Sequence, residues 1–216
     1  IFYLQPKCNM TTGELVSMEA LARWQKSDGT FVSPGEFIPL FESSGFITRF
    51  DMYIWKSVCK TLASWQDKGC KLVPISINVS MIDITNIDVP QYLSMLTEQY
   101  HISPEYLPVE ITESVFAESN TIVKNTITRF HEKGFYVLMD DFGSGYSSLN
   151  VLKDANVDYL KLDMKFMQID AKNKGKGIQI LKSIVDMAYR LGLVIIAEGV
   201  ETKEQSEILK SMNCNY

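Results

Sequence analysis

The sequence predicts an α/β fold of the barrel type, in which repeated βα units surround a mostly parallel sheet. Short β-rich runs alternate with helical patterns along the chain. The chain has 216 residues and 46% hydrophobic content, which is enough for one substantial core. It contains no internal repeat, low-complexity run or linker. We therefore expect residues 1–216 to form a single domain.

The strands are predicted from β-rich runs bounded by turn residues. Seven segments fit this description, at residues 2–5, 14–22, 72–79, 107–112, 135–140, 157–162 and 193–198.

Helical spacing is found between these strands. Ser33 and Glu36 have the pattern of a capping box, with Pro34 at the first helical position, and Thr202–Gln205 repeats the pattern. Three further apolar faces at helical spacing predict helices that end at Gly69, Gly134 and Gly192. The Lys- and Gly-rich segment 172–177 is predicted to be a solvated basic loop.

Composition limits the partners and the compartment. A net charge of -5 and a pI near 5.1 argue against binding of long nucleic acids, which requires a basic face. The four cysteines form no CxxC pair, which indicates reduced thiols and a cytoplasmic location. Apolar stretches such as 193–197 are too short to span a bilayer, so we expect no membrane contact by this domain. Because residues 1–6 already have the pattern of a strand, we expect a domain cut from a longer protein.

Several predicted strands alternate between apolar and polar residues with period two. The polar members are Glu19, Asn78, Glu110, Asp140 and Lys161. If the apolar members pack under helices, the polar members converge inside the barrel near the carboxyl ends of the strands. Active sites of such barrels lie at that end.

These residue types favour a hard cation. Taken singly, a carboxylate at a strand end is more often the partner of a nearby Arg or Lys. Together, several inward carboxylates are costly to bury without a compensating ion. Adjacent carboxylates about 4 Å apart, as Asp140 and Asp141 could be, repel by about 4 kcal/mol at an effective dielectric near 20. Because His101 and His131 lie outside these runs, the ligands are oxygens, which favours Mg²⁺ or Mn²⁺ over Zn²⁺.

The segment 140–148 contains a motif that also occurs in protein kinases, followed by a glycine- and serine-rich loop. Asp-Phe-Gly at 141–143 also occurs in protein kinases, but the HRD loop and the glycine-rich loop of a kinase are missing from this sequence. The loop at 143–148 fits either a simple turn into a helix near Ser147 or a mobile segment beside a metal site. Two hard cations held beside Asp140 and Asp141 would suit cleavage of a phosphodiester.

The motifs resemble those of one family, the EAL domains, which are bacterial phosphodiesterases specific for cyclic di-GMP. The similar segments are MEALARW at 18–24, INVS at 77–80, EITES at 110–114, DDFGSGYSSL at 140–149, KLD at 161–163 and AEGVET at 197–202. The resemblance implies a TIM-like (β/α)8 barrel with an antiparallel first strand. It also implies hydrolysis of cyclic di-GMP to linear pGpG with two Mg²⁺ or Mn²⁺ ions, while Ca²⁺ is expected to inhibit.

The resemblance also implies the metal ligands. Those of the first cation would be Glu19, Asn78, Glu110 and Asp140. Those of the second cation would be Asp140, Asp141 and Glu198. Lys161 is similar to the family lysine that contacts the attacking water, so it would act in catalysis together with Asp141 and Glu198.

Other residues are assigned by the same resemblance. Arg23 is similar to the arginine that holds a substrate phosphate, and Gln5 and Asp163 would contact substrate. Glu113 resembles the glutamate that anchors the loop after DDFG, and Glu201 is a companion acid whose role is left open.

One departure from the family pattern concerns the last strand. EAL domains continue into a final strand with a Gln-Gly-Tyr motif, whereas this sequence ends at Tyr216. The eighth strand and its glutamine are therefore missing from it; either the domain is truncated or the sequence ends before the folded protein does. A catalytically inactive cyclic-di-GMP receptor is the alternative function. The family also leaves open a homodimer and flanking sensor or GGDEF domains.

Overall fold

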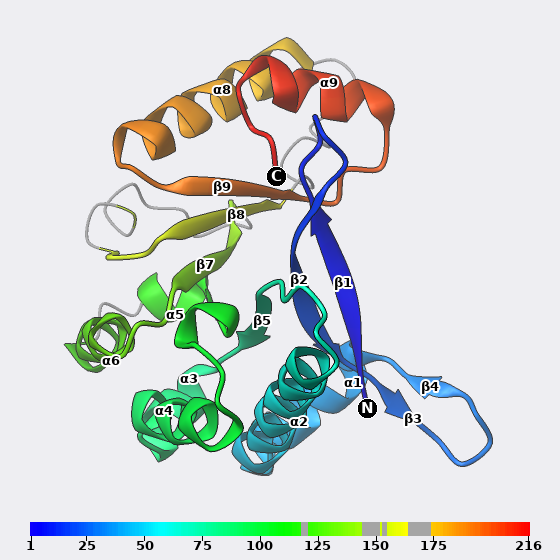
Figure 1. Ribbon diagram of the computed structural model, residues 1–216. Helices are drawn as coiled ribbons and strands as arrows, with labels where there is room; N and C mark the ends of the chain where they lie inside the picture. Colours follow the sequence, from blue (N-terminus) through cyan, green and yellow to red (C-terminus); the bar gives the residue numbers. More distant parts are fainter. Residues whose placement is uncertain (118–120, 144–151, 153–154, 164–173) are drawn as a thin grey trace.

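The computed structural model describes residues 1–117, 121–143, 152, 155–163 and 174–216. Among these residues, seven strands form one curled sheet in the order β1-β2-β5-β6-β7-β8-β9 (Figure 1). Their bounds are β1 Phe2–Cys8, β2 Leu15–Ala22, β5 Ile75–Asn78, β6 Val109–Thr112, β7 Val137–Phe142, β8 Tyr159–Asp163 and β9 Val194–Glu198. Strand β1 is antiparallel to β2, and the other neighbours pair in parallel. The seven predicted strands and the antiparallel first strand are confirmed, as part of a (β/α)8-type barrel.

Helices cover the outer face of this sheet (Figure 1). Their bounds are α1 Pro34–Ser43, α2 Ile47–Asp67, α3 Met81–Asn86, α4 Val89–Tyr100, α5 Glu113–Ala117, α6 Thr121–Glu132, α8 Lys174–Arg190 and α9 Lys203–Ser211, with a 3-10 helix η1 at Pro104–Tyr106. Apolar strand residues such as Ile77, Ile111 and Leu160 are fully buried in the same core as Trp55 of α2 and Phe130 of α6. This packing leaves the polar residues of each strand for the barrel interior.

The predicted helices are present, but several details of the prediction are wrong. The segment 172–177 is not a loop throughout, because α8 begins at Lys174. The Thr202 capping box of α9 is confirmed, with both of its side-chain bonds present. The Ser33 side chain makes no capping bond; instead, the Glu36 N–H donates to the Ser33 carbonyl oxygen at 2.9 Å.

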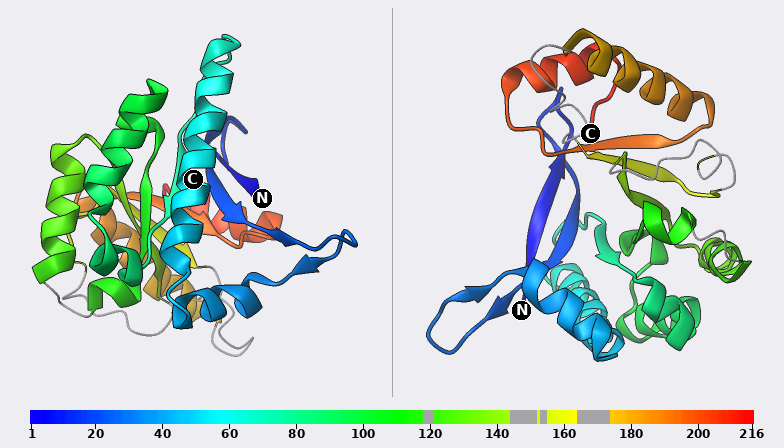
Figure 2. Two further views of the ribbon diagram at one scale, coloured as in Figure 1. Left: turned by 90° about the horizontal axis from the view of Figure 1, so that it is seen from below. Right: turned by 180° about the vertical axis from the view of Figure 1, so that it is seen from behind.

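A two-stranded hairpin stands apart from the barrel. Its strands, β3 Trp24–Gln25 and β4 Phe31–Val32, project away from the helices (Figure 2). Trp24 stacks on Phe41 of α1, with ring centroids 5.7 Å apart. The hairpin therefore extends from the end of β2, next to the carboxyl ends of the parallel strands.

The ends of the sheet come close at the last residues of the sequence. The Met10 N–H, just after β1, donates to the Asn215 carbonyl oxygen at 2.7 Å, and the Ala197 N–H of β9 donates to the Tyr216 carbonyl oxygen at 2.7 Å. Residues 215–216 thus connect the two edges of the sheet. In the part of the chain that is described, no helix is long and apolar enough to cross a membrane.

Candidate active site

A buried ammonium group surrounded by carboxylates lies inside the barrel. Lys161 of β8 is 1% exposed. Its Nζ is 3.0 Å from Glu19 Oε2, 3.0 Å from Asp140 Oδ1 and 2.8 Å from Glu198 Oε1. It also contacts Glu110 Oε2. These five side chains come from five different strands, so the curled sheet brings together residues up to 179 positions apart, from Glu19 to Glu198.

Three of these carboxylates form a group that could hold a metal ion. Glu19, Glu110 and Asp140 are buried, and each offers an oxygen within 4.8 Å of the others. Asn78, at the end of β5, donates through Nδ2 to Glu19 Oε1 at 3.3 Å, so its carboxamide lies beside the group. Its backbone carbonyl accepts from Trp55 Nε1 at 3.0 Å, which ties the end of β5 to α2. Carboxylate and carboxamide oxygens are the ligands that hard divalent cations prefer.

The charges in this cluster perturb one another. Burial disfavours the ammonium of Lys161, but the four surrounding carboxylates raise its pKa above the ordinary value. Burial raises the pKa of Glu198 to about 7, although the Lys161 charge opposes this rise. Burial also raises the pKa of Asp140, with the charges of Glu110 and Asp141 adding to it. The four carboxylates around Lys161 thus carry more negative charge than its ammonium group balances.

Asp141 lies next to Asp140 in an unusual backbone conformation. Its φ is +56°, and the pairing of β7 with β8 shifts between Met139 and Phe142. Such a bulge places one extra residue in β7. The left-handed backbone conformation of Asp141, a non-glycine residue, costs about 1 kcal/mol or more of strain. The Asp141 N–H donates to Asp140 Oδ1 at 2.8 Å. The bulge therefore keeps Asp140 inward and exposes Asp141 at the tip of the strand.

Three residues predicted to contact substrate lie near the carboxyl ends of the strands. Gln5 pairs with Glu19 across β1 and β2, and Asp163 pairs with Glu198 across β8 and β9. Each therefore shares the inward face with its partner. Arg23 follows β2 directly; its Nη1 donates to the Ala22 carbonyl at 2.8 Å.

Glu113 and Glu201 have different surroundings. Glu113 is buried at the start of α5, and its Oε2 accepts from the Gly143 N–H at 3.1 Å, which places it at the beginning of the loop after DDFG. The rest of that loop, from residue 144 to 148, lies outside the described residues. Glu201 is exposed, and its backbone N–H donates to Gln205 Oε1 at 2.8 Å as part of the start of α9.

The histidines lie elsewhere, as predicted. His101 ends α4 in a left-handed conformation, and His131 Nε2 lies 3.0 Å from Asp158 Oδ2.

Lys7 of β1 is a member of the cluster that the sequence analysis missed. Its Nζ lies 2.5 Å from Glu110 Oε1, 3.8 Å from Glu19 Oε2 and 3.0 Å from Ser76 Oγ. It lies two residues after Gln5 on the same strand, so strand periodicity puts both on the inward face. The two-residue spacing from Gln5 is therefore the feature of the sequence that indicates an inward position for Lys7.

Comparison with known proteins places the chain in a family. A model described as EAL domain matches residues 1–216. The chain is 35% identical over 215 residues to the protein named "Probable cyclic di-GMP phosphodiesterase PdeB" of Escherichia coli K12, covering 99% of this chain and 40% of that protein. It is 34% identical to the oxygen sensor protein DosP of the same organism, covering 97% of this chain and 26% of that protein. The chain thus spans less than half the length of both relatives.

The fold agrees with a solved structure. The PaMucR phosphodiesterase in its c-di-GMP complex superposes with a TM-score of 0.90 at 29% identity, covering 100% of this chain and 87% of that chain; the MucR protein is from Pseudomonas aeruginosa. The match extends over the whole sequence and over the strands that carry the cluster. This chain belongs to the EAL domain family.

Proposed function

We propose that this chain is a metal-dependent phosphodiesterase domain that hydrolyses cyclic di-GMP to linear pGpG. The observation that carries the proposal is the buried cluster of Lys161 with Glu19, Glu110, Asp140 and Glu198 at the catalytic end of an EAL barrel. The relative PdeB is named a cyclic di-GMP phosphodiesterase, and the PaMucR phosphodiesterase was solved with c-di-GMP. Both support the choice of substrate.

The donor set fits two divalent cations, Mg²⁺ or Mn²⁺. The oxygens of the first site would come from Glu19, Asn78, Glu110 and Asp140, and those of the second from Asp140, Asp141 and Glu198. When bound, such cations activate a water molecule and stabilise negative charge on phosphoryl oxygens. The fit is supported by an excess of carboxylates over ammonium groups in a buried site, which a divalent charge would balance.

The other residues would act on water and substrate. Lys161 lies at the centre of the cluster with four carboxylate partners; if divalent cations take over these carboxylates, its Nζ would have an N–H available to hold and orient a water molecule. Arg23 would bind a phosphate with its guanidinium, while Gln5 and Asp163 would contact the nucleotide from the inward faces of β1 and β8. Glu113 would anchor the loop that starts at Gly143. Glu201 is proposed only as a companion acid at the start of α9.

Ca²⁺ is expected to occupy the site with little turnover. It takes more ligands at longer distances than Mg²⁺ and tolerates irregular geometry. An arrangement suited to Mg²⁺ would then hold Ca²⁺ without aligning water and phosphate. Equal turnover in the two ions would contradict this expectation.

Turnover by the purified protein tests the proposal. With Mg²⁺ or Mn²⁺ it should convert cyclic di-GMP to pGpG, and Asp140→Asn should lower kcat/KM by at least about a hundredfold. Asp67→Asn, at the exposed end of α2, is the matched control and should leave turnover unchanged. Nucleotide binding without product at saturating metal would overturn the hydrolase proposal and favour a receptor.

The surroundings of the domain are part of the same proposal. We expect residues 1–216 to act within a longer protein, with sensor or GGDEF domains beside them, and to be cytoplasmic. The greater lengths of PdeB and DosP, and the description of DosP as an oxygen sensor, support flanking domains. The family resemblance leaves a homodimer open, and sedimentation of the purified chain would test it.

A further inference from the structure

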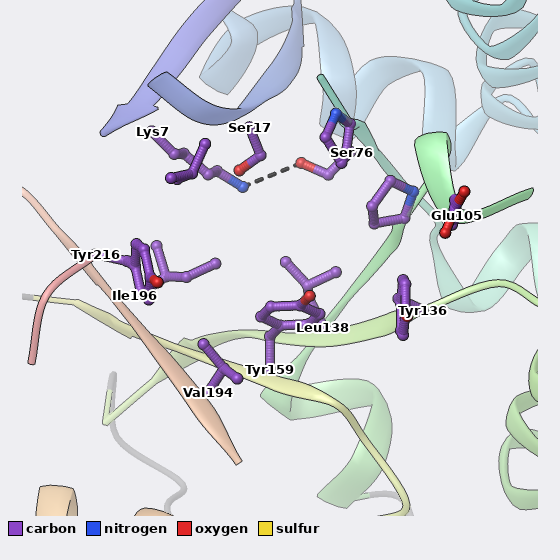
Figure 3. Close-up of a pocket in the computed structure, with 13 residues that line it drawn as sticks. Lys7, Ser17, Ser76, Glu105, Tyr136, Leu138, Tyr159, Val194, Ile196 and Tyr216 are labelled. Atoms are coloured by element: carbon purple, nitrogen blue, oxygen red, sulfur yellow. Dashed lines mark hydrogen bonds between the residues drawn. The ribbon is translucent and has the colours of Figure 1, made fainter. Parts of the chain in front are cut away.

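Lys7 reaches the active-site cluster from the opposite end of the barrel. A cavity of about 280 Å³ lies at the amino ends of the parallel strands, lined by Lys7 together with Ser17, Ser76, Leu138, Ile196 and Tyr216, among others. Figure 3 shows the Lys7 side chain crossing this space toward Ser76. The same Nζ of Lys7 also lies 2.5 Å from Glu110 Oε1. The ammonium group thus separates the cavity from the ligand carboxylates.

Two ammonium groups divide the carboxylate of Glu110 between them. Lys7 holds Oε1, and Lys161 contacts Oε2. Lys161 also contacts Glu19, Asp140 and Glu198, so Oε2 lies on the side of the ligand cluster. Oε1 faces the amino end of the barrel, where Ser76 is the second partner of Lys7. Glu110 is 1% exposed, so its carboxylate has little freedom to turn.

We propose that Lys7 is a positioning residue that determines metal selectivity, because it holds Glu110 Oε1 on the side away from the ligand cluster and leaves Oε2, which Lys161 contacts, as the oxygen that faces a cation. This inference rests on the metal site of the proposed function. Ca²⁺ readily takes both oxygens of a carboxylate, whereas Mg²⁺ requires near-octahedral geometry with single oxygens. Restricting Glu110 to one oxygen therefore disfavours Ca²⁺ more than Mg²⁺.

A purely structural role predicts a different result. If Lys7 only neutralises a buried carboxylate, its loss would lower stability and change the affinities for Mg²⁺ and Ca²⁺ by the same factor. The charge that Lys7 contributes acts on both divalent ions alike. The ratio of the two dissociation constants, Kd(Ca²⁺)/Kd(Mg²⁺), therefore isolates the constraint on Glu110.

Calorimetric titration of the protein with each metal, without nucleotide, measures this ratio. Lys7→Met keeps a stem of four heavy atoms and removes the ammonium group, and it should lower the ratio by about tenfold relative to the wild type. Lys7→Gln is the second variant, should Lys7→Met fail to fold. Lys60→Met removes a positive charge from an exposed position of α2 and should leave the ratio unchanged.

The cavity allows a rescue experiment. Lys7→Ala lacks three carbons and the ammonium group, the composition of n-propylammonium, and the cavity of about 280 Å³ beside it has room for that ion. Adding n-propylammonium to Lys7→Ala should move the ratio back toward the wild-type value. An unchanged ratio in folded Lys7→Met and Lys7→Gln would overturn the role of Lys7 alone. A wild-type protein that binds neither Mg²⁺ nor Mn²⁺ would overturn the metal site of the proposed function as well.

Discussion

Asp51 of α2 and Asp83 of α3 bring two carboxyl groups together away from the metal-ligand cluster. Asp83 is fully buried, and its Oδ2 accepts from the N–H and Oγ of Ser80 in a capping box. No donor from the described side chains reaches its buried Oδ1. Burial, with the charge and hydrogen bond of Asp83, raises the pKa of Asp51 to about 9. We expect a protonated Asp51 to donate a hydrogen bond to Asp83.

This pair should make stability depend on pH. Because the folded-state pKa of Asp51 is raised from 3.8 to about 9, its favourable contribution is complete below the unfolded value and is lost as pH rises through about 9. Asp51→Asn replaces the shared proton by an amide donor at every pH. The variant should therefore be more stable than the wild type at about pH 8.5, with a free energy of unfolding higher by about 1–3 kcal/mol and a correspondingly higher melting temperature. The gain should be smaller at about pH 5.

Thermal denaturation at the two pH values, in the presence of a chelator, measures this difference. Asp67→Asn on the exposed end of the same helix is the control, and it should show no such gain. A gain for Asp51→Asn that is as large at the lower pH as at the higher would show that no proton is shared.

Single residues were predictable where strand periodicity and residue type agreed. Glu19, Glu110, Asp140 and Lys161 lie on inward positions of their strands and are buried together, as the period-two pattern indicated. Lys7 was missed because the predicted strand, residues 2–5, ends before Pro6, whereas β1 continues to Cys8. The sharing of the Glu110 oxygens between two ammonium groups depends on distances that no sequence pattern contains.

At the scale of helices, two similar sequence patterns have different structures. Thr202 and Gln205 make both bonds of a capping box at α9, with the Thr202 hydroxyl accepting from the Gln205 N–H at 3.2 Å. Ser33 and Glu36 precede α1 in the same spacing, but the Ser33 side chain makes no capping bond. The pattern therefore predicts where a helix begins more reliably than how its first N–H groups are satisfied.

The two helices provide a matched pair of substitutions. Thr202→Ala should lower the free energy of unfolding by about 1 kcal/mol, which is about 2–4 °C in melting temperature for a domain of this size. Ser33→Ala should change it by less than about 0.5 kcal/mol, because no capping bond is lost. Chemical denaturation of the two variants compares them directly. Equal losses would mean that Ser33 caps α1 in solution.

Most of the elements that were missed are short. Helix α3 has six residues, too few for a helical period to be visible, and the strands of the β3–β4 hairpin have two residues each. Helix α4 was also not predicted, although Asp88 caps it through the Gln91 N–H and Pro90 lies in its first turn. Helix α8 was predicted, but its start was placed too late, because the Lys- and Gly-rich segment 172–177 was interpreted as a loop.

Over the whole molecule, the cluster couples strands that are distant in the sequence. Its carboxylates come from β2, β6, β7 and β9, and its ammonium groups from β1 and β8. Two ammonium groups face four carboxylates, so these six side chains carry a net charge of -2 when all of them are ionised. Repulsion among them acts on every strand that contributes a ligand.

Binding of a divalent cation should therefore stabilise the entire domain. At a free Mg²⁺ concentration of about 100 Kd, binding adds about 2.7 kcal/mol to the free energy of unfolding, or about 5–10 °C in melting temperature for a chain of this length. Differential scanning calorimetry with Mg²⁺, and again after removal of the metal by EDTA, measures the shift. Asp140→Asn should lose most of it, because that change removes a ligand shared by both proposed sites, whereas Asp67→Asn should keep it. If the melting temperature of Asp140→Asn shifts as much as that of the wild type, the stabilising cation binds outside the cluster. The cluster would then not be the origin of the coupling between strands.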